Sequence, residues 1–220
     1  IRSEGMMPAV AFVDPELTVT LPPEGTAHTG LDALTQALES YVSAGANPFS
    51  DALAQEAVLR IARWLRRAYQ DGGCREAREN MSLGSMLAGL ALASARLGLV
   101  HGIAHPLGAL YGLPHGQACA LLLPYVMEFN AGVAEAKFAR LARLLGVSET
   151  GNDTRDALAL IIWTRELCAG LGCFRPLSEY GLREEDFPAI VAAAMASGST
   201  KSNPRPVTEA DVKNILQRAK

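Results

Sequence analysis

The 220-residue sequence has no run of basic residues longer than the pair Arg66-Arg67, and its 20 basic and 23 acidic residues give a net charge of -3. A surface without concentrated positive charge does not attract the phosphates of a nucleic acid. The sequence therefore excludes nucleic acid as a partner. A small, roughly neutral partner fits this charge balance better.

Long apolar runs are also missing. The two longest, residues 85–99 and 118–127, are interrupted by Arg96 and Pro124. They are shorter than the ~20 residues that a membrane-spanning helix needs. The first residues do not show the pattern of a signal peptide. We therefore expect no membrane partner.

Cysteines are few, and their spacing does not indicate pairing. The four cysteines, Cys74, Cys119, Cys168 and Cys173, form no C-x-x-C motif, and two of them lie in apolar runs. This is typical of buried free thiols rather than of a disulfide framework. Because free thiols persist in a reducing compartment, we expect a cytoplasmic protein.

Apolar residues make up 49% of the chain, which is enough for a folded core. A strand-like run occupies residues 9–13 and ends at the turn dipeptide Asp14-Pro15, and Leu-Pro-Pro at 21–23 predicts a loop. From Thr29 onward Ala, Leu, Glu and Arg recur at helical spacing. The sequence therefore predicts one compact all-α domain with a short strand-like N-terminal entry.

Caps, turns and prolines set the expected helix bounds. Thr29, Ser50 and Thr208 are candidate N-caps, Pro124 is expected to kink or end its helix, and His28 is expected in a loop before the first helix. The expected helices cover residues 29–42, 50–69, 75–97, 101–109, 115–124, 134–145, 154–171, 184–196 and 208–219.

Three of the four histidines, His101, His105 and His115, fall in one apolar stretch interrupted by Gly and Pro. Burial disfavours charged imidazole, so a shared divalent metal is a simple explanation for this grouping. Asp32, which lies off the apolar stripe of the first helix, is the best anionic oxygen for such a site. Simpler explanations stay open: backbone carbonyls can satisfy each histidine, and Asp32 can interact with the helix dipole. Cys119 is expected nearby as a small apolar filler.

Several motifs, in this order, resemble the iron-containing (group III) alcohol dehydrogenases. The matching segments are VDPELT at 13–18, LPP at 21–23, TGLDALT at 29–35, GLVHGIAHPLG at 98–108, PHG at 114–116, LP at 123–124 and NPRP at 203–206. The resemblance covers nearly the whole chain and implies the helical C-terminal domain of a dehydroquinate synthase-like fold. We expect the NPRP segment to be a surface turn without a catalytic role.

In that family a nucleotide-binding α/β domain with a glycine-rich pyrophosphate turn precedes the helical domain. This sequence contains no G-x-G-x-x-G motif. The resemblance therefore implies that residues 1–28 connect to an absent N-terminal nucleotide-binding domain. Residues 29–220 are then the helical metal-binding catalytic domain.

Carried over residue by residue, the resemblance implies that Asp32, His101 and His115 bind the metal. His105 falls where the family places an imidazole near the nicotinamide and the substrate, which implies a catalytic and cofactor-binding role. The family's usual fourth ligand is a His four residues after the Asp, and Gln36 holds that position here. Gln36 offers only a neutral carbonyl oxygen, a poorer match to Fe²⁺ or Zn²⁺. We expect Gln36 to bind the metal weakly or to hold a water.

The resemblance implies a metal-dependent alcohol dehydrogenase or aldehyde reductase that forms a homo-oligomer. Fe²⁺, or alternatively Zn²⁺, would polarise the oxygen of a small alcohol or aldehyde during hydride transfer with NAD or NADP. Because the absent domain would hold that nucleotide, we expect the helical part alone to be inactive.

Two other functions stay open at this point. The missing phosphate loop and Gln36 are compatible with a non-catalytic helical assembly module that has a degenerate metal site. A metal-dependent hydrolase would need a general base, for which Glu39 is the nearby acid on the first helix. Metal analysis followed by a test of NAD(P)H binding would distinguish an enzyme from an assembly module.

Overall fold

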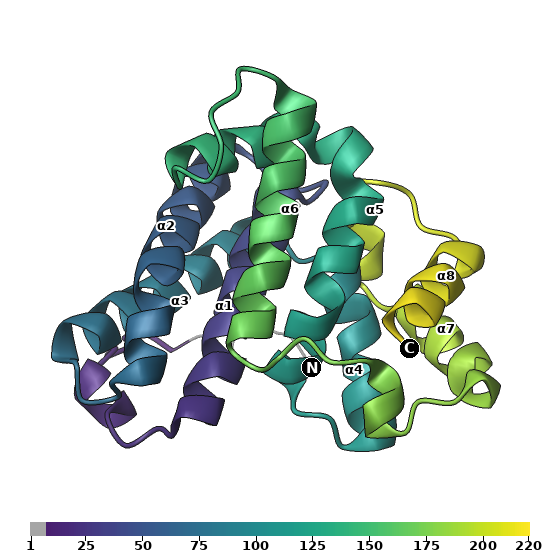
Figure 1. Cartoon of the computed structure of the whole chain (residues 1–220), viewed down its shortest axis with the longest axis horizontal. Helices are drawn as coiled ribbons and strands as arrows, with labels where there is room; N and C mark the ends of the chain where they lie inside the picture. The colour runs from purple at the N-terminus through teal and green to yellow at the C-terminus, as the bar shows by residue number, and fades with distance from the viewer. Residues whose placement is uncertain (1–7) are drawn as a thin grey trace.

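The computed structural model describes residues 8–220, and these residues form helices and no strand, which confirms the all-α fold class. The α-helices are α1 (Pro23–Val42), α2 (Pro48–Gln70), α3 (Arg75–Ala95), α4 (Leu99–Tyr111), α5 (His115–Leu144), α6 (Asp153–Gly170), α7 (Phe187–Ala196) and α8 (Glu209–Ala219) (Figure 1). Short 3-10 helices lie at Pro15–Thr18, Leu177–Tyr180, Glu184–Asp186 and Thr200–Ser202.

Helix α1 lies at the centre of this arrangement and packs against α2, α3 and α5 (Figure 1). Helices α2 and α3 pack along each other, and so do α5 and α6. Helix α4 packs between α5 and α7, and α7 contacts α8. A single apolar core joins all eight α-helices, with Tyr41 and Phe138 among its largest fully buried side chains. Helices α1, α4 and α5 therefore meet deep in the molecule.

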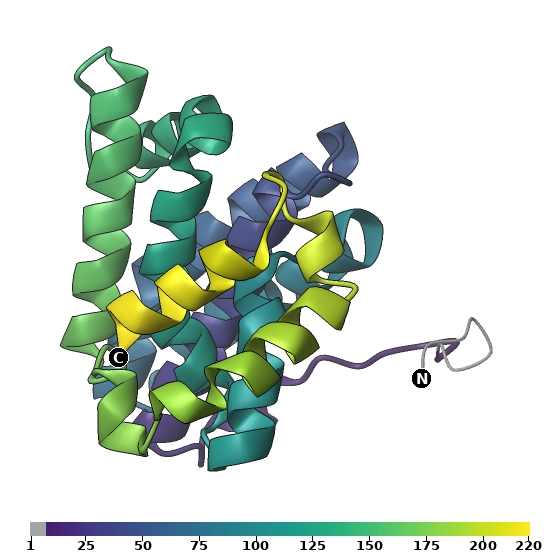
Figure 2. The same cartoon turned by 90° about the vertical axis from the view of Figure 1, so that its right-hand side faces the viewer.

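The expected strand at residues 9–13 is not formed. These residues are extended and exposed, and Figure 2 shows the segment leaving the helical body. The chain then enters the 3-10 helix Pro15–Thr18, for which Asp14 is the N-cap and accepts a hydrogen bond from Glu16 N at 3.0 Å. A strand needs a neighbour for its backbone hydrogen bonds. Residues 8–220 provide none.

Helix α1 begins at Pro23, six residues before its expected start at Thr29. The Leu-Pro-Pro motif at 21–23 is thus a helix start and not a loop, because proline is favoured in the first turn, where its missing N–H has no intrahelical partner. His28 consequently lies in α1, and the expected boundary between residues 28 and 29 falls inside this helix. Helix α2 is capped by Asn47, and Ser50 is the N3 residue of its capping box.

Pro124 does not end its helix, because α5 runs from His115 to Leu144 and includes the helix expected at 134–145. Pro124 is buried, and α5 packs against four other helices. Tertiary contacts thus outweigh the hydrogen bond that an internal proline removes. The helix expected at 184–196 is also different, since its first residues form the 3-10 helix Glu184–Asp186 before α7. The predicted Thr208 cap of α8 is confirmed, with a full capping box to Asp211.

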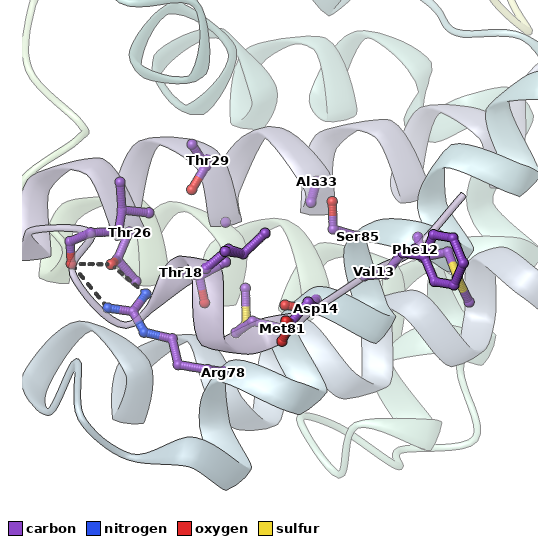
Figure 3. A pocket seen from close by; sticks show the side chains of 15 residues that line it. Phe12, Val13, Asp14, Thr18, Thr26, Thr29, Ala33, Arg78, Met81 and Ser85 are labelled. Atoms are coloured by element: carbon purple, nitrogen blue, oxygen red, sulfur yellow. Dashed lines mark hydrogen bonds between the residues drawn. The ribbon is translucent and has the colours of Figure 1, made fainter. Parts of the chain in front are cut away.

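A buried guanidinium fixes the start of α1. Arg78 of α3 donates to Thr26 Oγ1 at 2.8 Å and to Leu21 O at 2.9 Å (Figure 3). It also donates to Gly72 O at 2.9 Å. Burial lowers the pKa of Arg78, but these three acceptors satisfy its charge-bearing nitrogens. The bonds tie the α2–α3 turn to the entry of α1, beside a groove of about 520 Å³ between residues 12–18, α1 and α3.

The turn between α3 and α4 is sharp. Arg96 has φ 72° and ψ -174°, and within residues 8–220 it is the one residue other than glycine with a positive φ. This region is sparsely populated for residues with a Cβ and costs on the order of 1–3 kcal/mol.

No single helix in the described part of the chain is long and apolar enough to cross a membrane. Helices α3 and α4 meet that criterion only as a pair bent by 108°.

The turn between α5 and α6 closes around the buried carboxylate of Asp156. Asp156 accepts hydrogen bonds from Thr150 N (2.9 Å), Thr150 Oγ1 (2.8 Å), Ser148 Oγ (2.8 Å) and Arg143 Nε (2.8 Å). These bonds hold the pKa of Asp156 well below its ordinary value, and the bond from Thr150 N has the largest effect. The ionised carboxylate therefore stabilises the folded state.

Asp156→Asn should lower Tm at neutral pH, and its difference from the wild type should shrink in acid. Because the folded pKa is depressed, the stabilisation is complete above the unfolded pKa of about 3.9 and is lost as the pH falls through the folded value. Thermal unfolding followed by circular dichroism from neutral pH to about pH 3 measures this. An equal decrease in Tm at every pH would contradict the expectation.

Candidate metal centre

Side chains from three helices meet at one point in the structure. Asp32 Oδ1 of α1 lies 3.3 Å from His101 Nε2 of α4 and 3.6 Å from His115 Nε2 of α5. His101 is 2% exposed, whereas Asp32 is 21% and His115 is 41% exposed. The structure thus brings together the three residues that the sequence indicates as metal ligands, in a centre that is buried on one side and open on the other.

Two glycines, one in α5 and one in α4, let these helices approach their neighbours closely enough for the histidines to meet Asp32. A Cβ on Gly116, the residue after His115, would lie 2.0 Å from the backbone oxygen of His28 in α1. A Cβ on Gly102, the residue after His101, would lie 2.0 Å from Thr200 Oγ1. Since any side chain at these positions would push its helix away, the spacing of the two histidines depends on both glycines.

Glu39 orients the imidazole of His101. Its Oε2 accepts a hydrogen bond from His101 Nδ1 at 2.6 Å, and its Oε1 accepts one from Val100 N at 2.6 Å. A carboxylate acceptor places a proton on Nδ1, which leaves Nε2 facing the centre, as in carboxylate–histidine–metal arrangements. From the sequence, Glu39 is expected only as a possible hydrolytic base. Its position seven residues after Asp32, on the same face of α1, is the signal for this other role.

Two buried polar atoms in this centre have no hydrogen-bond partner, Asp32 Oδ1 and His101 Nε2. Within residues 8–220 the only other such atom is Arg60 Nε, which lies 2.6 Å from Glu56 Oε1. Buried polar atoms are rarely left without partners, because their desolvation is then not compensated. A cation bound to both atoms would satisfy them, so these residues fit a divalent metal.

The charges of the centre also fit a bound cation. Burial by itself would lower the pKa of His101, but the facing Asp32 carboxylate, the Cys119 thiol and the Glu39 carboxylate raise it to about 12. Burial would likewise raise the pKa of Asp32, yet the facing imidazole of His101 and its charge hold it below its ordinary value. Two carboxylates around one buried imidazole therefore require a positive charge between them. A metal cation can supply this charge in place of the Nε2 proton.

Cys119 also lies in the centre, where the sequence predicted an apolar filler. Its Sγ lies 3.6 Å from His115 Nε2, and the donor atoms of Asp32, His101, His115 and Cys119 all lie within 4.8 Å of one another. Burial raises the pKa of the Cys119 thiol to about 11. Residues four apart share a helix face, so the spacing from His115 to Cys119 is the signal that places this thiol.

Gln36 and His105 flank the centre. Gln36 Nε2 donates to Asp32 Oδ2 at 3.0 Å, so its amide contacts the centre through the carboxylate. The ring of His105 is stacked on that of His115 with 5.1 Å between centroids, and its centroid lies 6.1 Å from that of His101. Partial burial, and then the charges of His115 and His101, lower the pKa of His105. His105 is consequently neutral at pH 7 although one side is exposed.

The segment at 203–206, expected as a surface turn, is buried at its first residue. Asn203 is 6% exposed, and its Oδ1 accepts hydrogen bonds from Leu99 N at 3.3 Å and Asn130 Nδ2 at 3.0 Å. Its Nδ2 donates to Asn130 Oδ1 at 2.8 Å. Helix α4 has Gly98 as N-cap and no side-chain cap of its own. Asn203 and Glu39 thus provide acceptors for its first backbone N–H groups.

Comparison with known proteins gives relatives over almost the whole chain. The chain is 44% identical over 215 residues to 1,3-propanediol dehydrogenase of Klebsiella pneumoniae, covering 97% of this chain and 55% of the relative. It is 40% identical over 214 residues to lactaldehyde reductase of Escherichia coli (strain K12), covering 97% of this chain and 56% of the relative. The chain therefore spans about half the length of these curated relatives.

Solved structures agree with these relatives. A crystal structure of 1,3-propanediol oxidoreductase matches with a TM-score of 0.92 and 42% identity, over 94% of this chain and 55% of that chain. An alcohol dehydrogenase from Oenococcus oeni matches with a TM-score of 0.91 and 39% identity, over 94% of this chain and 54% of that chain. The family model "Fe-containing alcohol dehydrogenase family, C-terminal" matches residues 26–220. The chain thus belongs to the iron-containing alcohol dehydrogenase family and corresponds to its C-terminal region.

Proposed function

We propose that this chain is the metal-binding part of an NAD(P)-dependent alcohol dehydrogenase or aldehyde reductase acting on a small alcohol or aldehyde. In this proposal residues before α1 connect to a nucleotide-binding domain, since the chain has no glycine-rich phosphate loop and spans about half of its relatives. The related 1,3-propanediol dehydrogenase and lactaldehyde reductase support the reaction class by their names.

The observation that carries the proposal is the pair of unpartnered buried atoms, Asp32 Oδ1 and His101 Nε2, facing the same point as His115 Nε2. One carboxylate and two imidazoles form a ligand set suited to Fe²⁺ or Zn²⁺. A divalent ion held there would supply the Lewis acidity that polarises an alcohol or carbonyl oxygen. Glu39 keeps the Nε2 lone pair of His101 directed into the centre.

His105 is placed for proton transfer. In alcohol oxidation the substrate loses a hydride to the nicotinamide and a proton to the protein or solvent. The His105 ring is beside the metal centre and exposed, and its lowered pKa keeps it neutral and able to accept that proton. It also lines a cavity of about 440 Å³ with the apolar Leu92 and the hydroxyl-bearing Ser197 and Ser199. Arg96 also lines this cavity, and Asp32, His101 and His115 do not.

The two alternative functions have less support. A hydrolase would need Glu39 as a general base, but both of its oxygens already accept hydrogen bonds, from His101 Nδ1 and Val100 N, and it is 5% exposed. A role as an assembly module does not explain why a buried carboxylate and a buried imidazole lack hydrogen-bond partners.

Metal analysis of purified variants tests the proposal. We expect about one divalent ion per wild-type chain and a loss of metal affinity of at least about tenfold in His115→Ala, since even residues outside the ligand shell have effects of that size. Turnover of the intact protein should fall in parallel. His28→Gln, a change of the α1 histidine outside the donor group, should leave both unchanged.

Two outcomes would contradict the proposal. Near-normal turnover of His115→Ala in metal-stripped buffer would show that the metal has no catalytic role. An intact wild-type protein that binds neither a divalent metal nor NAD(P)H would instead favour the assembly module.

A further inference from the structure

The centre contains a fourth donor atom at the spacing that a tetrahedral ion requires. Four ligands at 2.0–2.3 Å from one ion are about 3.3–3.8 Å apart. The distances from Asp32 Oδ1 to the Nε2 atoms of His101 and His115 are 3.3 and 3.6 Å, and Cys119 Sγ lies 3.6 Å from His115 Nε2. All four donor atoms lie within 4.8 Å of one another, so the sulfur stands among the donors and has tetrahedral spacing from His115 Nε2.

Gln36, the other candidate for the fourth position, is engaged elsewhere. Its amide nitrogen donates to Asp32 Oδ2 at 3.0 Å, so that the nitrogen and not the carbonyl oxygen of the amide faces the carboxylate. Cys119, in contrast, belongs to the one group of three or more His, Cys, Asp and Glu donors that residues 8–220 bring within ligand distance. The structure therefore favours Cys119 over Gln36 as the fourth ligand.

A second observation shows that the sulfur is not simply filling the core. His101 Nε2, on a side chain that is 2% exposed, is directed into the same space and has no partner. Cys168 and Cys173 are equally buried, yet they belong to no such donor group, and Cys173 Sγ donates to Leu171 O at 3.5 Å. Among the buried thiols of the described chain, Cys119 is thus distinguished by its surroundings.

We propose that Cys119, as a thiolate, is the fourth protein ligand of the metal and makes the centre prefer Zn²⁺ to Fe²⁺. This inference rests on the proposed function, because it assumes that Asp32, His101 and His115 hold a divalent ion. Binding replaces the S–H bond with a sulfur–metal bond and releases one proton to solvent, without any redox change. Thiolate is a softer ligand than carboxylate or amide oxygen and suits zinc particularly well.

Cobalt substitution tests the ligand directly. Co²⁺ bound by thiolate shows an intense sulfur-to-cobalt charge-transfer absorption in the near ultraviolet, which nitrogen and oxygen ligands do not produce. We expect this band in the wild-type protein and in Cys168→Ala, a matched change of a buried helical cysteine outside the centre. Cys119→Ala should lose the band but keep the weaker visible bands of bound cobalt.

Competition between metals tests the preference. The ratio of Zn²⁺ to Fe²⁺ affinity, measured anaerobically, should fall by at least about tenfold in Cys119→Ser, an effect at the lower end of those known for groups around metal sites. Circular dichroism of each variant confirms that the helices remain folded. An unchanged ratio in a folded Cys119→Ser variant would overturn the preference for zinc.

The outcomes separate this inference from the proposed function. If the wild-type protein bound cobalt without the charge-transfer band, the role of Cys119 alone would be overturned. The same would follow if Cys119→Ala bound cobalt and kept the band. A wild-type protein that binds neither Co²⁺ nor Zn²⁺ would overturn the metal centre itself and this inference with it.

Discussion

Replacing Glu39 with glutamine should leave the protein folded but weaken its affinity for the metal by about 10–100-fold, the usual effect of removing a group that orients a metal-binding histidine. Glu39 accepts two hydrogen bonds, from His101 Nδ1 and from Val100 N, each at 2.6 Å. Glutamine has one acceptor oxygen and one amide group that only donates, so it can serve one of these donors and not the other. His101 would then lose its fixed orientation, or α4 would lose a hydrogen bond at its first turn.

Titration of the purified variant with Zn²⁺ against a chelator measures this effect. Glu166→Gln makes the same chemical change at an exposed position of α6 and should keep wild-type affinity. Glu39→Ala should bind metal even more weakly and should lose stability, by on the order of 3–5 kcal/mol, because both buried donors are left without an acceptor. Equal affinities of Glu39→Gln and Glu166→Gln would show that Glu39 has no part in orienting the ligand.

Gly116→Ala should disrupt the metal centre without changing any ligand. The new Cβ would lie 2.0 Å from the backbone oxygen of His28, so α5 must move away from α1 by about 1 Å or more to restore ordinary contact distances. His115 is on the moving helix and Asp32 is on the other, so their 3.6 Å separation must increase. A displacement of about 1 Å can cost on the order of a hundredfold in rate. We expect a loss of this size in turnover, together with weaker metal binding.

The overpacking itself should destabilise the fold by about 1–3 kcal/mol, which thermal unfolding measures. Gly132→Ala is the matched control, since Gly132 lies on the same helix and an added Cβ there would meet nothing within 4 Å. Alanine is the better helix former, so this control should be about 0.5–1 kcal/mol more stable than the wild type and should bind metal normally. If both variants bound metal equally well, the close crossing of α1 and α5 would not be what sets the donor spacing.

The sequence predicted the three converging residues of the centre but not the hydrogen bonds of Glu39 or the place of Cys119 among the donor atoms. Asp32, His101 and His115 stand out because polar groups in apolar surroundings need a common explanation. Glu39 and Cys119 follow from helical spacing once α1 and α5 are known, at seven residues from Asp32 and four from His115. Composition alone does not distinguish a thiol that packs from one that faces a donor group. That distinction depends on how closely helices cross.

The helical class was predictable, whereas several bounds were not. Helical spacing after Thr29 is a strong signal, and the Thr208 cap of α8 is chemically unambiguous. Proline is ambiguous, because Pro23 begins a helix and Pro124 lies inside one. The apolar run at 9–13 has the local pattern of a strand, but a strand forms only beside a partner. The missing strand and the uninterrupted α5 are thus decided by distant parts of the chain, whereas the helix start at Pro23 is decided locally.

The start of α4 has a consequence for the order of folding. A helix of 13 residues whose N-cap is a glycine is marginal by itself, and its first N–H groups depend on Glu39 and on Asn203, which lies near the C-terminus. During synthesis α1 and α5 emerge from the ribosome well before Asn203 does. Leu99 N, at the start of α4, therefore gains its side-chain acceptor only after the C-terminal segment has docked, whereas Glu39 can hold His101 earlier. In the proposed metal centre, the helix that presents His101 is thus fully capped only late in folding.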